Sequence, residues 1–311
     1  MTESNKVAYI FPGQGSQTVG MGKDLYETFQ SSKTVIDQAD EVLKFPLSRL
    51  FFEGPEDELR QTVNAQPALV TVSFACLKAM QETGVNIASV AFMAGHSLGE
   101  YTALAAADVI DFATAVYLAR ERGRLMQEAG TATPGGMVAV LGMDEDALAE
   151  VCKETDTQIA NYNSPGQLVI SGAAPNVARA AELAKSRGAS RTVPLQVSGA
   201  FHSPLMKPAE EALSGMVASM PFKSPTVPIV GNTTALPLTT ADDVKAELTR
   251  QLCHGVQWQR SVEYMVAQGV STFVEIGPSK VLTGLVRRIN KNVATVNVGD
   301  VQTVRDVARS E

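Results

Sequence analysis

Short apolar runs alternate with amphipathic stretches along most of this chain. Residues 7–11 and 90–94 are apolar runs of strand length that end at turn-forming residues, which is typical of buried strands. Three further strand candidates follow later, at residues 228–230, 272–276 and 293–298. Stretches with helical periodicity separate them, at residues 67–80, 112–127, 241–253 and 281–289. Strands that alternate with helices indicate a mostly parallel sheet whose two faces are both covered.

The middle of the chain departs from this rhythm after the turn-rich residues 130–136. The pattern that follows is strand, helix, strand, strand, helix, strand, at residues 137–141, 144–152, 158–162, 167–171, 175–187 and 191–197. This order is the split βαβ arrangement of a ferredoxin-like unit. We therefore expect two parts, a large subdomain of residues 1–129 and 199–311 and a ferredoxin-like small subdomain of residues 130–198.

The composition is that of an ordinary globular protein. Of the 311 residues, 45% are hydrophobic, which is enough for a sizeable core. The 26 basic and 33 acidic residues give a formal net charge of −7, so the chain has no general attraction for nucleic acid or for an anionic membrane. We expect neither as a partner, and an acidic partner has to dock at a local basic patch.

Two further features concern compartment and metal content. Residues 1–6 lack the basic and then apolar pattern of a signal peptide, so we expect a cytoplasmic protein. The three cysteines, Cys76, Cys152 and Cys253, are odd in number, far apart and without metal-ligand spacing. We expect them to be reduced thiols, and we expect neither a metal site nor a cofactor.

The segment Gly95-His96-Ser97-Leu98-Gly99 carries the first candidate chemistry. It follows a predicted strand and precedes a helical pattern over residues 100–107. Between a strand and a helix, Gly-x-Ser-x-Gly is the pattern of a nucleophile elbow, a tight turn that presents one serine. Ser97 is therefore the candidate nucleophile. The alternative is a glycine-bounded turn with an ordinary serine.

A serine nucleophile needs a base, and the chain has only three histidines. We expect His96 to point away from its neighbour Ser97 and to pack or form a hydrogen bond. His254 stands at the end of a predicted helix, where it can bind the last carbonyls. His202 lies in a loop beyond the predicted small subdomain, from which a side chain can reach the elbow. We therefore favour His202 as the base.

A glycine-rich loop, Gly13-Gln14-Gly15-Ser16-Gln17, follows the first predicted strand. It does not match a dinucleotide fingerprint, because Thr18 stands where the third glycine would be, and no P-loop lysine follows. Beside a serine nucleophile, such a loop can bind the developing oxyanion through backbone N–H groups. We expect the amides of Gln14 and Leu98 to do so. The alternative is a flexible loop with no such role.

Arg122 is distinguished by its position on the predicted helix 112–127. Steps of about 100° per residue place it on the apolar face, whereas Arg120 and Arg124 fall on the opposite, wet side. A buried guanidinium needs an anion, because an unpaired buried charge is costly. Two partners remain open at this stage: a structural aspartate or glutamate, and a carboxylate carried by the substrate.

Six segments together resemble one family. They are residues 11–17, 95–101, 122–123, 199–206, 251–258 and 275–278. In their order and spacing the chain resembles the malonyl-CoA:acyl-carrier-protein transacylases over essentially its whole length. The resemblance implies an acyltransferase, and the expected fold class is α/β, with an α/β-hydrolase-like core, a mostly parallel sheet and an inserted ferredoxin-like small subdomain.

Site roles follow from the resemblance residue by residue. It implies that Ser97 is the nucleophile, that His202 is the base and that Arg122 binds the malonyl carboxylate. It also implies an oxyanion hole formed by the backbone N–H groups of Gln14 and Leu98. No residue type departs from the family pattern at these positions.

The resemblance implies two further positions and the partners. The backbone carbonyl of Gln251 would orient His202 in place of a triad acid, and Phe201 resembles malonyl-selective members, in which a bulky group crowds an α-methyl substituent. The implied partners are malonyl-CoA and holo acyl carrier protein. Either fatty acid or polyketide synthesis fits this chemistry, and the sequence leaves the oligomeric state open.

Two other functions remain possible from the residues alone. A thioesterase or carboxylesterase would use the same serine and histidine with water as the acceptor, but Arg122 and the lack of an evident triad acid weigh against it. A non-catalytic protein that binds a carrier would not need an intact serine, histidine and arginine. Two basic clusters could receive a carrier, and each could equally be a solvated surface: Arg287, Arg288 and Lys291, or Lys185, Arg187 and Arg191.

Overall fold

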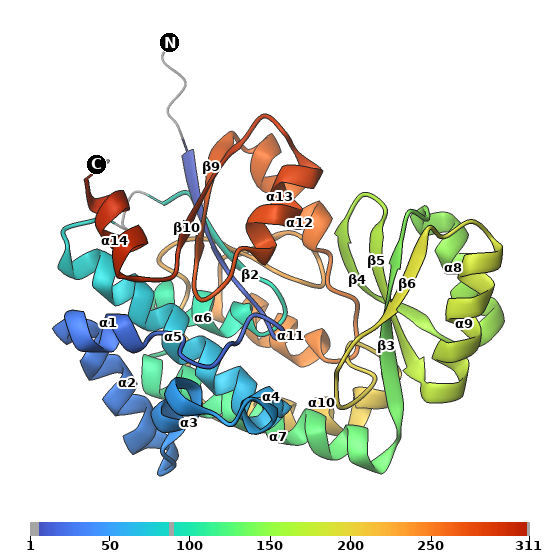
Figure 1. Ribbon diagram of the computed structural model, residues 1–311, viewed down its shortest axis with the longest axis horizontal. Helices are drawn as coiled ribbons and strands as arrows, with labels where there is room; N and C mark the ends of the chain where they lie inside the picture. The colour runs from blue at the N-terminus through green and yellow to red at the C-terminus, as the bar shows by residue number, and fades with distance from the viewer. Residues whose placement is uncertain (1–5, 87–89, 310–311) are drawn as a thin grey trace.

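The computed structural model describes residues 6–86 and 90–309, and these residues form a mixed α/β fold on two sheets (Figure 1). Residues 1–5 lie outside the described residues, and they make up most of the segment, residues 1–6, that lacks a signal-peptide pattern. The last two positions of the expected large subdomain, residues 310–311, also lie outside the described residues. Within the described residues, no helix is long and apolar enough to cross a membrane.

The larger sheet is mostly parallel, as predicted. Its strands are β1 (Lys6–Phe11), β2 (Phe92–Gly95), β7 (Ile229–Val230), β8 (Pro237–Leu238), β9 (Val270–Ile276) and β10 (Ala294–Val298). They lie in the order β10-β9-β1-β2-β7-β8, and each neighbouring pair is parallel except β7 with β8. The predicted strands all form, whereas β8 was not predicted.

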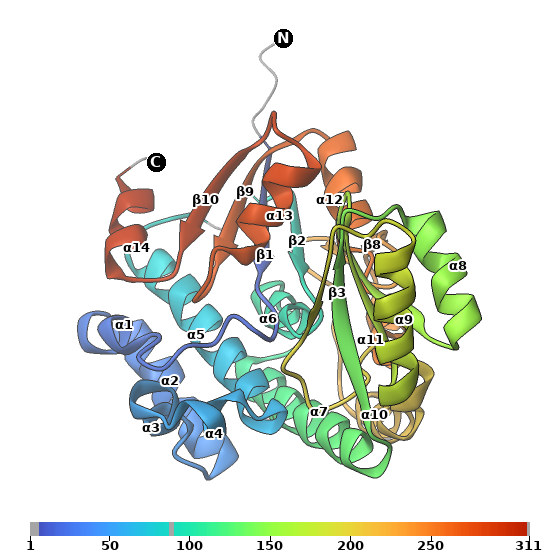
Figure 2. The same ribbon diagram turned by 45° about the vertical axis from the view of Figure 1, so that its right-hand side comes forward.

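Helices cover both faces of this sheet, as the sequence pattern indicated. Alternate residues of β1 enter different cores: Ala8 and Ile10 pack in one, Tyr9 and Phe11 in the other. The helices α12 (Trp258–Ala267) and α13 (Val281–Ile289) pack on the first face, and α5 (Thr62–Glu82) and α6 (Gly99–Ala106) on the second (Figure 2). Because both faces of β1 pack against apolar side chains, its sequence is a near-continuous hydrophobic run.

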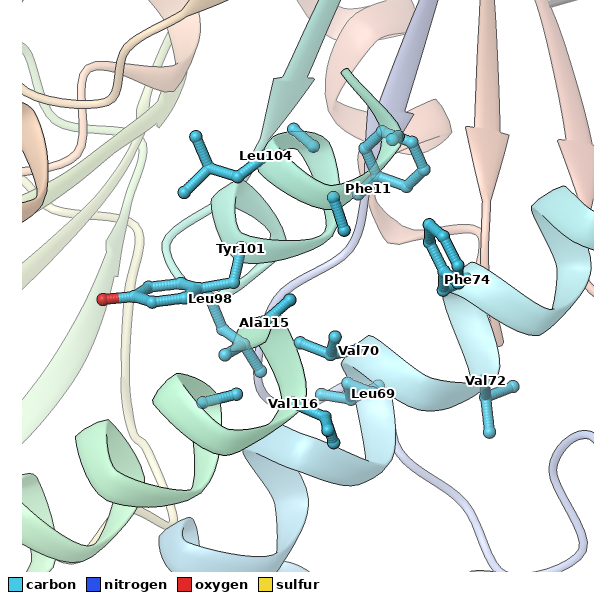
Figure 3. Close-up of a cluster of buried hydrophobic side chains, with 14 of the residues drawn as sticks. Phe11, Leu69, Val70, Val72, Phe74, Leu98, Tyr101, Leu104, Ala115 and Val116 are labelled. Carbon is cyan, nitrogen blue, oxygen red and sulfur yellow. The ribbon is translucent and has the colours of Figure 1, made fainter. Parts of the chain in front are cut away.

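The second face holds the main core of the protein. Side chains of α5, α6 and α7 (Phe112–Ala132) meet there beside the end of β1 (Figure 3). Leu69 and Val70 of α5 lie against Val116 of α7, and Leu98 and Tyr101 come from the elbow and α6 (Figure 3). The helix that follows the elbow is therefore held by apolar packing on several sides.

The smaller sheet is antiparallel and has the predicted order of elements. The segment that forms this sheet and its two helices comprises β3 (Gly135–Leu141), α8 (Glu145–Thr155), β4 (Gln158–Ser164), β5 (Gln167–Ala173), α9 (Ala174–Ser186) and β6 (Arg191–Pro194). The strand order is β4-β5-β3-β6, with α8 and α9 on the side away from the larger sheet (Figure 1). An isolated parallel bridge joins Asn161 of β4 to Val256, so the two parts of the chain are also linked through their backbones.

Helices α5 and α7 extend well beyond the predicted ranges, and α8 ends three residues later than predicted. Helix α5 begins at Thr62 and includes Pro67, which was expected to open the helix. A proline inside a helix leaves one carbonyl without its N–H donor, and here the Val63 carbonyl accepts a hydrogen bond of 3.1 Å from Arg120 Nη1 instead. Helix α7 continues to Ala132, so the first three residues of the turn-rich segment are helical.

The environment of Arg120 corrects a second expectation. It was placed on the wet side of α7, but it is half-buried. Its guanidinium also binds Asn64 Oδ1 and lies 4.8 Å from the ring centroid of Phe45. Arg120 therefore closes the gap that Pro67 leaves in α5, which the periodicity of one helix could not reveal.

Several elements were not predicted. They are α1 (Lys23–Thr28), α2 (Gln30–Leu43), α3 (Leu47–Glu53), α4 (Glu56–Arg60), α10 (Lys207–Ser219), α12 and α14 (Val301–Ala308), together with the 3₁₀ helix η2 (Pro204–Met206). Most are short and rich in polar residues, so their helical period spans too few turns to stand out in the sequence. Their formation depends on packing against the larger elements.

The crossing of α5 and α7 yields a stability prediction. A Cβ atom at Gly123 of α7 would lie 2.5 Å from the Thr62 carbonyl oxygen and 2.9 Å from Val63 Cα. Because backbone atoms cannot move aside easily, we expect Gly123→Ala to lower the free energy of unfolding by about 1–3 kcal/mol. Chemical denaturation measures this change.

Gly215 of α10 provides the matched control. A Cβ atom there meets nothing within 4 Å, so Gly215→Ala should raise the free energy of unfolding by about 0.5–1 kcal/mol through helix propensity alone. Equal effects of the two substitutions would contradict the close helix crossing.

Candidate active site

The turn between β2 and α6 has the geometry of a nucleophile elbow. A Cβ atom at Gly95 would lie 1.9 Å from the Gly99 carbonyl carbon, and one at Gly99 would lie 2.1 Å from the Phe11 carbonyl oxygen. Glycine at both positions lets the helix start directly against the strands. Ser97 itself has φ of 50°, the left-handed region that a non-glycine residue seldom adopts. The strained turn presents Ser97 toward the space between the two sheets.

Ser97 and His202 are hydrogen-bonded although 105 residues separate them. Ser97 Oγ lies 2.8 Å from His202 Nε2, and His202 Nδ1 lies 2.8 Å from the backbone carbonyl oxygen of Gln251. A carbonyl only accepts, so Nδ1 carries the proton and Nε2 is left as an acceptor for the Ser97 hydroxyl. His202 also has a left-handed φ of 57°, and its own carbonyl accepts a hydrogen bond from Gln158 Nε2.

The burial of His202 controls its protonation. The side chain is almost fully enclosed. Burial, and then the nearby positive charge of Arg122, lowers the pKa of His202 to about 3. The imidazole is therefore neutral at physiological pH, which is the form that can accept a proton.

Arg122 lies on the buried face of α7, as its helical phase predicted, with only 1% of its surface exposed. Its guanidinium donates to Gln66 Oε1 at 2.9 Å, to Gln251 Oε1 at 2.8 Å and to Ser97 Oγ at 3.1 Å. All three acceptors are uncharged, and within the described residues no aspartate or glutamate forms an ion pair with Arg122. Its Nε is also buried without an acceptor. No carboxylate in the described residues therefore binds this guanidinium directly, and Glu100 is linked to it through the Gln251 amide.

Three buried polar side chains lie beneath the elbow: those of Asn232 and Glu100 were not found from the sequence, and Gln251 was predicted only for its backbone carbonyl. Asn232 Oδ1 accepts a hydrogen bond of 2.6 Å from the Ser97 backbone N–H, and Gln251 Nε2 donates to the Ser97 carbonyl at 3.0 Å. Glu100 binds both amides through its two carboxylate oxygens. Glu100 could have been noticed as the only charged residue of the otherwise apolar α6, whereas Asn232 carries no local signal.

The proposed oxyanion-binding residues lie next to the nucleophile. Gln14 lines the same cavity as Ser97, and Leu98 follows Ser97 at the start of α6. Among the described residues, no acceptor is found for the backbone N–H of Gln14 or of Leu98. Close packing of Gly13 against the His96 carbonyl holds the two loops together, since a Cβ atom at Gly13 would lie 2.3 Å from that oxygen.

These groups open onto a cavity of about 400 Å³ between the two sheets. Helix α4 and residues 195–197 border it, together with Met126 of α7 and Met137 of β3. Phe201 lines the cavity beside His202 and is itself largely buried. A mixed polar and apolar cavity of this size can hold a small acyl group next to a serine.

The other two histidines have the hydrogen-bonding roles that the sequence predicted. His96 points away from the Ser97 hydroxyl: its Nε2 lies 2.8 Å from Asn163 Oδ1, and its ring centroid lies 5.6 Å from that of Trp258. His254 Nδ1 lies 2.8 Å from the Arg250 carbonyl at the end of α11 (Ala241–Gln251). Neither is hydrogen-bonded to Ser97.

The cysteines lie apart from this site. Cys76 and Cys152 are buried and Cys253 is half-buried. Burial raises the pKa of all three thiols, so they stay protonated at neutral pH. In the part of the chain that the structure describes, no group of three or more histidine, cysteine, aspartate or glutamate residues could hold a metal ion.

Comparisons with known proteins all point to one family. The family described as "Acyl transferase domain" matches residues 8–307. Two relatives are named "Malonyl CoA-acyl carrier protein transacylase": one from Bacillus subtilis, 48% identical over 96% of this chain and 95% of its own, and one from Escherichia coli K12, 46% identical over 91% of this chain and 92% of its own.

Two solved structures are similar throughout. An acyl carrier protein S-malonyltransferase from Vibrio cholerae superposes with a TM-score of 0.93 at 43% identity, covering 97% of this chain and 99% of its own. A malonyl-transacylase in complex with its type II PKS acyl-carrier protein superposes with a TM-score of 0.94 at 39% identity, covering 98% of this chain and 100% of its own. This chain belongs to the acyl transferase family and, within it, to the malonyl CoA-acyl carrier protein transacylases.

Proposed function

We propose that this enzyme transfers a malonyl group from malonyl-CoA to the phosphopantetheine thiol of holo acyl carrier protein, through a malonyl-serine intermediate. The observation that carries this proposal is Arg122, a buried guanidinium that donates to Ser97 Oγ and faces uncharged acceptors only. A substrate carboxylate beside Ser97 would provide the missing negative charge.

The first half-reaction follows from the hydrogen bond between Ser97 and His202. His202 Nε2 takes the hydroxyl proton while Ser97 Oγ attacks the thioester carbonyl carbon. The tetrahedral intermediate collapses by breaking the carbon–sulfur bond, and the thiolate of coenzyme A leaves with the proton from His202. The Gln251 carbonyl keeps Nδ1 protonated, so that no carboxylate is needed as a third member.

The developing oxyanion needs donors that are free and already in place. We assign this role to the backbone N–H groups of Gln14 and Leu98, which stand beside the cavity and the nucleophile. Such preorganised donors commonly contribute about 3–4 kcal/mol to transition-state stabilisation.

The second half-reaction repeats these steps with a different acceptor. His202 removes the proton from the pantetheine thiol, the thiolate attacks the malonyl-serine carbonyl, and Ser97 leaves with that proton. Arg122 holds the malonyl carboxylate through both halves. Phe201 at the cavity wall disfavours an α-methyl substituent on the acyl group. Both fatty acid and polyketide synthesis use this product.

The architecture and location complete the proposal. We describe the larger part as an α/β-hydrolase-like core, residues 1–129 and 199–311, with a ferredoxin-like small subdomain of residues 130–198. The elbow after β2 and the separate antiparallel sheet support this division. The cytoplasmic location expected from the sequence is part of the same proposal.

The carrier docking surface is proposed at α13. Lys185 and Arg187 each form an ion pair with a glutamate, whereas Arg287 and Arg288 donate to uncharged side chains. The charge of the second pair is therefore less neutralised and better suited to attract an acidic carrier.

Intact-mass measurements test the function as a whole. After incubation with malonyl-CoA and holo carrier protein, we expect malonylated enzyme and malonylated carrier, and Ser97→Ala should form neither. Release of free malonate without carrier labelling would indicate a hydrolase instead, and unchanged masses would indicate a protein that only binds.

The proposed binding of the malonyl carboxylate by Arg122, here called the carboxylate clamp, predicts a change of acyl preference. Arg122→Ala removes charged hydrogen bonds worth about 1.5–3 kcal/mol each, so malonyl transfer should fall at least about 100-fold while acetyl transfer is kept or gained. Steady-state kinetics with both acyl-CoA substrates measures this. Arg124→Ala, on the exposed side of the same helix, is the control and should alter neither rate. Equal losses for both acyl groups would rule out the clamp.

The low pKa of His202 predicts that acylation is insensitive to mild acid. A histidine with the ordinary pKa of about 6.5 would be almost fully protonated at about pH 5 and would slow the reaction about 30-fold. Because the pKa of His202 is about 3, the single-turnover rate of Ser97 acylation should change less than about twofold between about pH 7.5 and 5. A 30-fold fall would contradict the neutral buried base.

Folding has to be followed in the same experiment. Below about pH 6.5 the unfolded chain binds a proton at this histidine, whereas the folded protein does so only near the lowered pKa. The stability that His202 contributes is therefore fully present above about pH 6.5 and is lost as the pH falls from there toward the lowered pKa. Circular dichroism at each pH separates unfolding from loss of the base.

A further inference from the structure

A fully buried carboxylate lies directly beneath the elbow and takes no part in the steps above. Glu100 stands on α6, three residues after Ser97, and none of its surface is exposed. Its Oε1 accepts hydrogen bonds from the Asn232 backbone N–H at 3.1 Å and from Asn232 Nδ2 at 2.9 Å, and its Oε2 accepts one from Gln251 Nε2. All of these neighbours are donors, so the group at position 100 has to supply acceptors on both oxygens.

The two amides bound by Glu100 present their opposite ends to the site. Asn232 Oδ1 accepts from the Ser97 N–H at 2.6 Å, and Gln251 Oε1 accepts from Arg122 Nη2 at 2.8 Å. A side-chain amide has one donor end and one acceptor end. Glu100 accepts from the donor ends of both amides, as do the carbonyls of Gly95 and Ser97, and the acceptor ends are thereby held toward Ser97 and Arg122.

We propose that Glu100 is a positioning residue that sets the orientation of the Gln251 amide and so keeps the Arg122 guanidinium directed at the substrate carboxylate. This inference rests on the proposed function of Arg122. Glu100 acts at one remove, since Gln251 stands between it and Arg122. Burial and the nearby Glu247 carboxylate raise the pKa of Glu100, and the hydrogen bonds from Asn232 and Gln251 oppose that shift by stabilising the charged form.

A neighbouring buried carboxylate shows what a structural role alone looks like. Glu247 of α11 is only 3% exposed, and it accepts hydrogen bonds from the Thr233 backbone N–H at 2.7 Å and from Thr233 Oγ1 at 2.6 Å. Within the described residues, these hydrogen bonds involve Thr233 and not Ser97, Arg122 or Gln251. Glu247 thus matches Glu100 in burial and chemistry, and although its charge raises the pKa of Glu100, its own hydrogen bonds go to Thr233 and not to the Gln251 amide.

The substitution Glu100→Gln separates these roles. The introduced amide can still accept from Asn232 through its oxygen, but its NH₂ group then faces the Gln251 NH₂ group. Rotation of the Gln251 amide relieves this conflict, but it withdraws the donor from the Ser97 carbonyl and turns it toward Arg122, another donor. Arg122 loses one acceptor and is displaced from the position that binds a carboxylate.

We expect Glu100→Gln to raise KM for malonyl-CoA about tenfold, as loss of one charge-assisted hydrogen bond implies. The kcat/KM for acetyl-CoA should change less than about threefold, because acetyl has no carboxylate for Arg122 to bind. The ratio of malonyl to acetyl kcat/KM should therefore fall about tenfold.

Glu247→Gln is the matched control. It removes a buried carboxylate of the same kind and should keep the wild-type ratio of malonyl to acetyl transfer, even where thermal unfolding shows a lower Tm. An unchanged ratio in Glu100→Gln, or an equal shift of the ratio in both variants, would overturn the proposal.

Should Glu100→Gln fail to fold, Gln251→Met by itself should lower the ratio of malonyl to acetyl kcat/KM about tenfold, and an unchanged ratio would overturn the proposal. Where Glu100→Gln folds, a double variant tests the path of transmission. Gln251→Met removes the amide that connects Glu100 to Arg122, so adding Glu100→Gln to it should leave the ratio unchanged. Different ratios in the single and double variants would contradict transmission through Gln251.

The proposed function can fail separately from this inference. If wild-type enzyme does not transfer malonyl at all, the function is wrong. If wild-type enzyme does transfer malonyl, but Glu100→Gln keeps the full preference for malonyl over acetyl, then the positioning role is wrong and the function stands.

Discussion

The burial of the Arg122 guanidinium among uncharged acceptors is the constraint on which the active site depends. A charge at this depth has to be solvated by the protein, and Gln66, Gln251 and Ser97 do so with their oxygens. The arrangement holds the side chain in place, but among the described residues no carboxylate binds the guanidinium directly. This preorganised positive charge beside Ser97 is the feature on which the proposed binding of a malonyl carboxylate rests.

The backbone around this charge is held by contacts that only small residues permit. Gly95 and Gly99 bring α6 against the strands, and Gly123 brings α7 against α5. These close approaches bring α5, α6 and α7, which come from separate parts of the chain, to within hydrogen-bonding distance of one another. The left-handed backbone at Ser97 persists because Asn232 and Gln251 bind the N–H and the carbonyl of that residue from below.

Local patterns carried a large part of the fold and the site. Alternating apolar runs predicted the parallel strands, and the phase of one helix was enough to place Arg122 inside the protein. His202 was found by elimination among three histidines. The start of α5 was missed because Pro67 argues against a helix interior until Arg120 is seen to satisfy the Val63 carbonyl. The polar N-terminal helices were missed because their helical period spans too few turns to stand out.

By itself, the sequence determined the elements whose pattern is local: the strands, the elbow and the buried face of α7. Tertiary structure alone decided how distant residues meet, such as Ser97 with His202 and Glu100 with Gln251. The physical reason is that periodicity records which side of an element is apolar, whereas a hydrogen bond between distant segments depends on how whole elements pack. Asn232 is the clearest case, since nothing near it in the sequence indicates that it holds the nucleophile in place.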